Sequence, residues 1–308
     1  MLKIFLVSLT LASLFFPKAS LKASPGDRGS FKVYKDLLKI PITAKTNIDG
    51  KIFAPSHDGG SYIPHHKFPL VILVPAFSWG LRYYEEYALH LASHGYMVMG
   101  LSLSKYSVFK KANHKQNAKE VVQAITFILS KKNHNHNRYI DTSKIAVSGH
   151  SVGGKVAFYA ASLDPRIKLV LAMDPVNIGG PPCFISPKAC HNYPVAPNPK
   201  TGQKGVMMAM QAKALIFRAK PDWISNPEPQ FNGIHFWYGL KNEGYLLNFA
   251  RAKHLSWIRK KEVIEITKRT MVAYLQQEFF LLDRSAYFDG AIIDRDIKQG
   301  ILSEVRKK

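Results

Sequence analysis

This sequence has only two cysteines and, beyond its first residues, no long apolar run. Cys183 and Cys190 are spaced C-x6-C, which matches no zinc pattern, and two thiolates are too few ligands for such a site. No segment after the amino terminus reaches about 18 uninterrupted apolar residues, the length that a membrane-spanning helix needs. A structural zinc site and an internal membrane span are therefore not expected.

Acidic residues are also scarce. The 21 Asp and Glu stand against 43 Lys and Arg, which gives a formal net charge of +22. Such a surface predicts attraction to anionic surfaces, for example membrane headgroups or envelope polysaccharide. The basic residues are spread in short clusters without a nucleic-acid-binding motif, so no specific nucleic acid is expected as a partner. We expect a monomer.

The amino terminus carries the longest apolar region. Met1-Leu2-Lys3 is followed by a largely apolar run from Ile4 to Phe16, and Pro17 and small residues come next. A basic start, a short apolar centre and a small-residue exit are typical of a secretory signal peptide. We therefore expect residues 1–23 to be a leader and the protein to be exported, either periplasmic or secreted. In such a compartment a disulfide between Cys183 and Cys190 is favoured over two free thiols.

The remainder, residues 24–308, reads as a single α/β domain. A hairpin is expected first, with Asn47–Gly50 as the turn between the strands 37–43 and 51–54. A continuous apolar strand, 68–75, follows, and from there helices and strands alternate. Such alternation predicts a mostly parallel central sheet with helices on both faces. A Pro- and Gly-rich loop is expected over 177–204, and a polar tail from about residue 283. The expected elements after 75 are helices at 81–93, 115–131, 152–163, 230–240 and 261–282, and strands at 96–101, 145–148, 169–173, 214–219 and 245–249.

The segment Gly149-His150-Ser151-Val152-Gly153 fits G-x-S-x-G between an apolar strand and an amphipathic helix. That context is required by a nucleophile elbow, where a sharp turn exposes a serine and its neighbours two residues away must lack bulk. We therefore predict Ser151 as a nucleophile.

A serine needs a base, and the base needs an orienting acid. In this kind of sheet both partners come later in the chain, the acid before the histidine. His254 follows the last expected strand and is the preferred base, whereas His235 lies within a helical pattern. Asp174 and Asp222 each follow a strand, and spacing alone does not separate them as the acid. Two backbone amides should form the oxyanion hole, that of Val152 and that of Phe77 or its neighbour.

These motifs resemble a known family. The stretch Gly149–Lys155, together with Asp174-Pro175-Val176, is similar to chlorophyllases. More broadly, the chain over roughly 68–257 resembles the branch of the α/β-hydrolase superfamily that contains platelet-activating-factor acetylhydrolases and bacterial cutinase-like polyester hydrolases. The resemblance implies an α/β-hydrolase fold. In chlorophyllases and acetylhydrolases the acid maps to Asp174, which we favour, and in polyester hydrolases it maps to Asp222. Val152 stands where chlorophyllases usually carry arginine, which argues against chlorophyll itself as the substrate.

The resulting prediction is an exported serine esterase or lipase that needs no metal or other cofactor and acts on a small-molecule or lipid ester. Two alternative functions stay open. One is a non-catalytic exported binding protein on a hydrolase scaffold, and the other is an acyltransferase or peptidase with the same triad.

Overall fold

A computed structural model provides the structure of this chain. It describes residues 23–63, 65–103, 113–177, 195–197, 202, 204–220 and 233–308. The expected leader, apart from its last residue, lies outside the described residues, and so do Cys183, Cys190, Asp222 and most of the loop 177–204.

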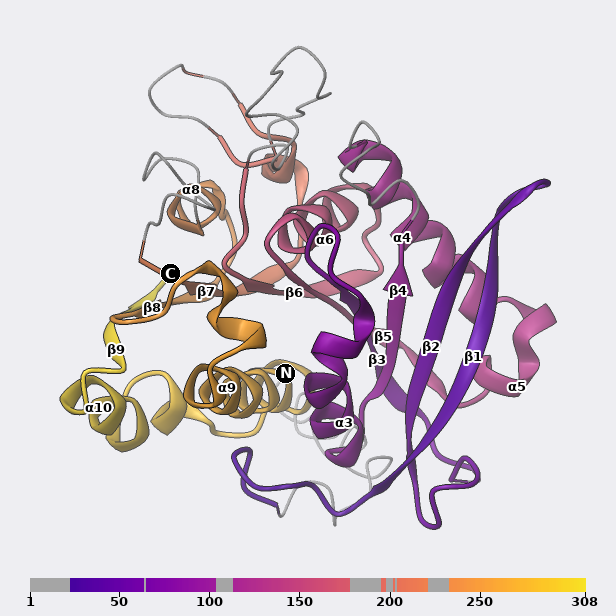
Figure 1. Cartoon of the computed structure of the whole chain (residues 1–308), viewed down its shortest axis with the longest axis horizontal. Helices are drawn as coiled ribbons and strands as arrows, with labels where there is room; N and C mark the ends of the chain where they lie inside the picture. Colours follow the sequence, from indigo (N-terminus) through magenta and orange to yellow (C-terminus); the bar gives the residue numbers. More distant parts are fainter. Residues whose placement is uncertain are drawn as a thin grey trace, which may run out of the picture.

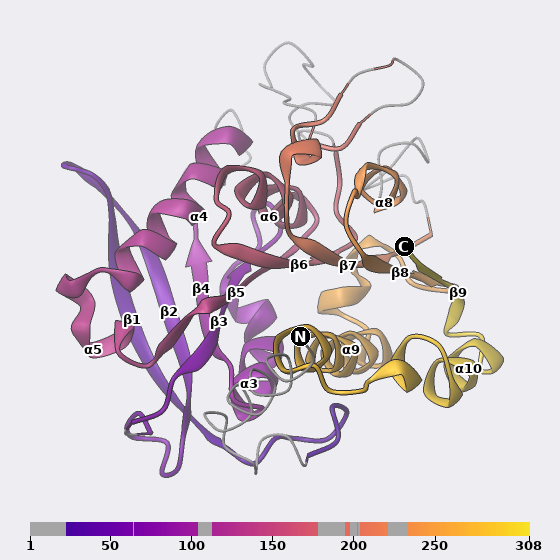
Figure 2. The same cartoon turned by 180° about the vertical axis from the view of Figure 1, so that it is seen from behind.

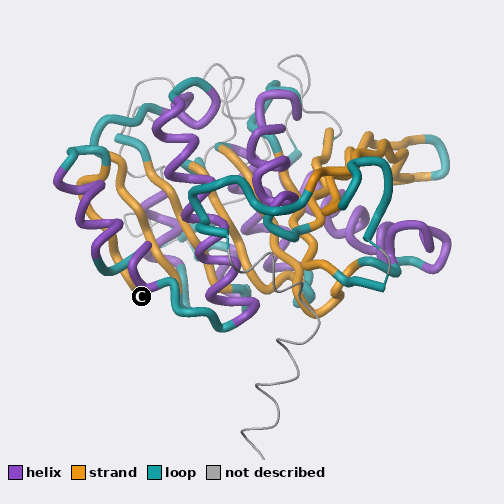
Figure 3. Tube along the Cα trace, turned by 90° about the horizontal axis from the view of Figure 1, so that it is seen from below, coloured by secondary structure: helices purple, strands orange, loops and turns teal. Residues whose placement is uncertain are grey.

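One nine-stranded sheet runs through the molecule in the order β1-β2-β4-β3-β5-β6-β7-β8-β9 (Figure 1). The strands from β4 to β8 in this order are mutually parallel, whereas β2 pairs antiparallel with both of its neighbours and β9 pairs antiparallel with β8. Figure 3 shows the strands as one continuous layer. The strands are β1 Lys32–Thr43, β2 Thr46–Ser56, β3 Phe68–Val74, β4 Met97–Ser102, β5 Ile140–His150, β6 Ile167–Met173, β7 Lys213–Arg218, β8 Gly244–Phe249 and β9 Leu302–Lys307.

Helices cover both faces of this sheet (Figure 1 and Figure 2). α4, α6 and α8 lie on one face, and α3, α9 and α10 lie on the other. Within the described ranges, no helix is long and apolar enough to cross a membrane. The α-helices are α3 Glu85–Ser93, α4 His114–Leu129, α5 His134–Asn137, α6 Val152–Leu163, α8 Gly233–Gly239, α9 Lys261–Phe280 and α10 Ala291–Lys298, and the 3-10 helices are η1 Leu81–Tyr84, η2 Lys131–Asn133, η4 Val206–Ala209, η6 His254–Ile258 and η7 Ser285–Tyr287.

The central strand β3 shows why the sheet needs two covering layers. Leu70 and Ile72 pack into the core under α4 and α6, whereas Val71 and Leu73 pack into the second core under α3 and α9. Successive side chains of a strand point to opposite faces, so a continuous apolar run must be buried on both. The α/β architecture with a mostly parallel sheet is confirmed.

Two expectations about the ends of the domain are wrong. The hairpin turns between Thr43 and Thr46, and Asp49 and Gly50 lie inside β2 opposite Lys39 and Leu38, because strand pairing continues past the Asp-Gly pair. The segment after residue 283 is not a loose polar tail. It forms η7, α10 and β9, and its apolar side chains complete the core under α9. Those side chains include Tyr287, Phe288, Ile293 and Leu302.

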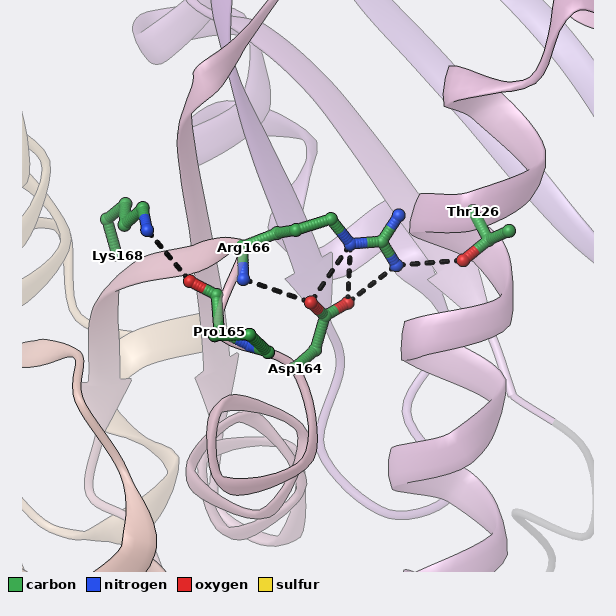
Figure 4. Close-up of polar contacts among 5 residues, drawn as sticks. All are labelled: Thr126, Asp164, Pro165, Arg166 and Lys168. Carbon is green, nitrogen blue, oxygen red and sulfur yellow. Dashed lines mark hydrogen bonds and ion pairs between the residues drawn. The ribbon is translucent and has the colours of Figure 1, made fainter.

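An ion pair fixes the crossover from α6 to β6 at the end of the sheet remote from Ser151 (Figure 4). Asp164 caps α6 and accepts hydrogen bonds from the backbone and the guanidinium of Arg166. The same guanidinium donates to Thr126 Oγ1 of α4 at 2.8 Å, and Lys168 Nζ donates to the carbonyl of Pro165. The contact thus ties α4 to the loop between the elbow helix and β6.

Two buried histidines, His90 of α3 and His94 at its C-cap, hold the segment that leads into β1. His90 Nε2 hydrogen-bonds the carbonyl of Pro25 at 2.9 Å, and His94 hydrogen-bonds that of Asp27 at 2.8 Å. Burial, reinforced by the neighbouring His94, lowers the pKa of His90 from its ordinary value of 6.5 to about 4.

We therefore expect the free energy of unfolding to fall as the pH drops from 7 to 4. In this window the unfolded chain binds a proton at His90 that the folded chain does not, so acid favours unfolding. The share of His90 between pH 7 and 5 is about 2 kcal/mol. Urea unfolding at pH 7 and at pH 5 should show that the free energy of unfolding depends less on pH in His90→Gln than in wild type. The exposed His57→Gln variant should show the same dependence as wild type. Equal slopes in all three proteins would contradict the assignment.

Candidate active site

Ser151 occupies a sharp turn between β5 and α6. Its backbone angles are φ 58° and ψ −122°, a conformation that residues other than glycine rarely adopt. A Cβ on Gly149 would lie 2.3 Å from Gly153 O, and one on Gly153 would lie 2.3 Å from Val74 O. The turn therefore needs glycine at both positions, which gives the G-x-S-x-G spacing its physical reason.

Backbone hydrogen bonds hold this turn against the neighbouring strand. The amide of Ser151 donates to the carbonyl of Met173 at 2.9 Å, and the carbonyl of Ser151 accepts from the amides of Lys155 and Val176. The loop that follows β6 is thereby fixed to the turn that carries the serine.

The structure brings together Ser151, His254 and Asp174, which are far apart in the sequence. His254 Nε2 lies 2.7 Å from Ser151 Oγ, and His254 Nδ1 lies 2.6 Å from Asp174 Oδ2. All three side chains are buried. Because a carboxylate only accepts, Nδ1 carries the proton and Nε2 is left to accept the proton of the serine hydroxyl. This is the geometry that a serine, its base and an orienting acid require.

Asp174 is itself held in place. It has φ 41°, its amide donates to the carbonyl of Phe217, and its second oxygen, Oδ1, accepts the amide of Ala219 at 3.0 Å. Of the two acids that the sequence left open, Asp174 is the one that contacts His254, and Asp222 lies outside the described residues. His235, the other histidine considered as base, hydrogen-bonds the carbonyl of Pro197 from α8.

The predicted oxyanion donors lie on two segments beside Ser151. Val152 is the first residue of α6, where amides have no partner within the helix. Phe77 follows β3, and the amide of the preceding residue, Ala76, already donates to Tyr84 Oη at 3.2 Å.

Sequence reasoning missed three polar residues around this site. Tyr84 and His150 are fully buried and hydrogen-bond each other at 2.7 Å. Lys155, one turn after Ser151, is also fully buried. Its Nζ donates to the carbonyl of Asn177 at 3.0 Å, and burial lowers the pKa of its ammonium to about 7. Only Lys155 carried a signal, as a lone charge in an otherwise apolar helix.

The side chain of Asn177 closes the base of the loop that follows the acid. Its Oδ1 accepts the amides of Val195 and Ala196, and its Nδ2 donates to the carbonyl of Ala196. Lys155 and Asn177 together connect α6 to both ends of this loop, at residue 177 and at residues 195–196. Across the described ranges, no three His, Cys, Asp or Glu side chains are grouped so that they could hold a metal ion.

A mostly parallel sheet covered on both faces, with a serine on a strained strand-to-helix turn, defines the α/β-hydrolase fold. A protein-family model described as Chlorophyllase matches residues 47–194, which include the elbow and Asp174 but not His254. The thiohydrolase apmlB of Arthrinium phaeospermum is 29% identical over 131 residues, and the match covers 39% of this chain and 39% of that protein. The chain thus matches well under half the length of this curated relative. These matches confirm the resemblance to the chlorophyllase-like branch of the α/β-hydrolase superfamily.

Proposed function

We propose that this protein is an exported serine hydrolase that cleaves carboxylic esters. The observation that carries the proposal is the His254 imidazole, which hydrogen-bonds Ser151 Oγ through one nitrogen and Asp174 through the other. In this arrangement His254 Nε2 can take the proton of Ser151 Oγ without a rearrangement of either side chain.

The reaction then runs in two halves. Ser151 Oγ attacks the ester carbonyl while His254 Nε2 takes the hydroxyl proton, and the amides of Val152 and Phe77 stabilise the negative charge that develops on oxygen. The tetrahedral intermediate collapses, His254 gives the proton to the departing alcohol, and an acyl-Ser151 remains. Water, deprotonated by the same imidazole, attacks the acyl group and releases the acid and the free serine.

Incubation with a fluorophosphonate probe and with p-nitrophenyl esters tests this proposal. We expect ester hydrolysis and one covalent label per chain, and peptide mapping should place the label on Ser151. A folded protein that hydrolyses no ester and takes no label would overturn it.

A thioester is a second candidate substrate. The relative apmlB is described as a thiohydrolase, and the same attack on a carbonyl would release a thiol in place of an alcohol. Matched oxygen and sulfur esters of one acyl group separate the two, through the ratio of their kcat/KM values. A triad acyltransferase or peptidase would differ from both only in its acceptor or leaving group.

The segment after β3 that carries Ala76 and Phe77 is called the oxyanion loop below. A cavity beside it favours a substrate with one apolar arm. A cavity of about 240 Å³ lies between the segment after β3 and the end of β4. Pro75 and Ser78 of its lining flank Phe77 in the sequence, and we propose that an ester bound at the oxyanion amides extends one arm into it. The lining residues are Pro75, Ser78, Trp79, Gly80, Leu101, Ser102 and Leu103.

Gly80→Leu is expected to fill this cavity without strain, because Gly80 has φ −77° and a Cβ there meets no atom within 4 Å. We expect kcat/KM for an octanoate ester to fall about tenfold or more, since each methylene kept out of an apolar site forfeits about 0.8 kcal/mol. The acetate ester should change by less than about twofold. Gly60→Leu, on the exposed loop after β2, is the matched control. Equal effects on both esters would show that the cavity does not hold the substrate.

We further propose that the protein acts outside the cytoplasm as a monomer. The leader and the surplus of basic residues fit an exported monomer that is drawn to anionic surfaces, where lipid esters are found. A non-catalytic binding protein on the same scaffold is the alternative, and it would leave the contacts among Ser151, His254 and Asp174 without a role.

A further inference from the structure

We infer that Tyr84 and His150 form a buried hydrogen-bonded link that positions the two halves of the active site relative to each other, and that Tyr84 is a positioning residue for catalysis. The inference rests on the proposed function. Neither residue contacts the reacting atoms.

The link consists of three consecutive hydrogen bonds. The amide of Ala76, next to the predicted oxyanion donor, lies 3.2 Å from Tyr84 Oη. Tyr84 Oη lies 2.7 Å from His150 Nδ1, and His150 Nε2 lies 2.8 Å from the backbone carbonyl of His254. The chain of bonds therefore runs from the oxyanion loop to the residue that carries the catalytic base.

The chemistry of each group fixes the direction of every bond. The carbonyl of His254 can only accept, so His150 Nε2 carries the proton. Burial lowers the pKa of His150 well below its usual value, so the imidazole is neutral and its Nδ1 is an acceptor. Tyr84 must then donate its hydroxyl proton to Nδ1, which leaves its oxygen to accept the Ala76 amide. With a neutral His150, this is the one placement of the protons that satisfies all three bonds.

Packing makes the link rigid. Tyr84 and His150 are both fully buried. The His150 ring lies on the His254 ring, with 4.9 Å between the ring centroids, and 5.9 Å from that of Trp257. His150 is also the residue next to the nucleophile, and its imidazole is connected directly to His254 and, through Tyr84, to Ala76 of the oxyanion loop. A link of this kind, with every donor and acceptor paired, restricts the relative movement of the segments that it joins.

Tyr84→Phe breaks the link and leaves two buried polar groups, the Ala76 amide and His150 Nδ1, without their partner. Loss of a whole oxyanion donor costs about 10²–10³ in kcat, and displacement of the segment beside one should cost less. We expect kcat per titrated active site to fall about 10- to 100-fold with KM nearly unchanged. The affinity for a boronic acid, which forms a tetrahedral adduct with the serine, should fall by a similar factor.

Tyr87→Phe is the matched control. Tyr87 is buried one turn further along, and its hydroxyl donates to the carbonyl of Trp257 at 2.8 Å, so the substitution also removes one buried tyrosine hydrogen bond. This hydroxyl is hydrogen-bonded to Trp257 and not to Ala76 or His150, and kcat per active site should stay within about threefold of wild type. Counting sites with the fluorophosphonate probe removes any effect of a smaller folded fraction.

His150→Gln provides a second route should Tyr84→Phe fold poorly. A glutamine amide can donate to the His254 carbonyl but presents no ring nitrogen to Tyr84. We expect it to reproduce the fall in kcat, and the double variant should be no slower than the slower single variant, because both changes break one link. The inference is wrong if Tyr84→Phe and Tyr87→Phe have the same kcat and boronate affinity. It is also wrong if the losses of kcat caused by Tyr84→Phe and by His150→Gln multiply in the double variant. An inert wild-type protein would instead refute the proposed function.

Discussion

Replacing Ser151 by alanine is expected to lower kcat for ester hydrolysis by about 10⁶-fold and to abolish labelling by a fluorophosphonate. The hydroxyl is hydrogen-bonded to His254 Nε2 at 2.7 Å, so its loss removes the nucleophile and the proton that the base would take. Binding of the substrate should survive, because the cavity beside the oxyanion loop is untouched.

Ser148→Ala is a suitable control for this experiment. Ser148 lies three residues earlier, in β5, it is fully buried, and its hydroxyl has no hydrogen-bond partner within the described part of the chain. Its removal should leave kcat within about twofold. If Ser151→Ala retained both hydrolysis and labelling, the elbow serine would not be the nucleophile. If wild type and Ser151→Ala bound an ester equally and neither hydrolysed it, the binding-protein alternative would hold.

Replacing Asp174 by asparagine is expected to lower kcat by about 10⁴-fold with little change in the fold. The carboxylate accepts two donors at present, Ala219 N–H on Oδ1 and His254 Nδ1–H on Oδ2. Asparagine has one acceptor oxygen for these two donors. When that oxygen pairs with the Ala219 amide, the NH₂ group faces His254 Nδ1, and the imidazole proton moves to Nε2. A protonated Nε2 cannot take the serine proton.

Asp222→Asn decides between the two acids that the sequence left open. We expect kcat to stay within about threefold of wild type in this variant. A large loss in Asp222→Asn with none in Asp174→Asn would transfer the role to Asp222. Equal mild losses in both variants would show that neither aspartate orients the base, and the triad assignment would fall. Circular dichroism of each variant confirms that the fold is intact.

Much of the architecture could be predicted from local patterns. The apolar run of β3 and the strand–turn–helix context of the elbow each depend on residues close together in the chain. Helix α6 was expected over the very residues where it occurs, because the elbow turn before it and its helical pattern of apolar residues are local features. The ends of the domain were less predictable. The strands β1 and β2 continue past an Asp-Gly pair, and β9 forms only because β8 offers it an unpaired edge.

The active site, like the fold, was predictable from the sequence only in part. The sequence by itself determined that Ser151 stands on a glycine-flanked turn, and it limited the base and the acid to a few residues after later strands. Only the tertiary structure decided that Asp174 faces His254, because this depends on the parallel pairing of β6, β7 and β8, which no local pattern encodes. The link through Tyr84 and His150 has the same origin. Its partners come from four separate segments, and each hydrogen bond exists only once the sheet and α3 have packed together.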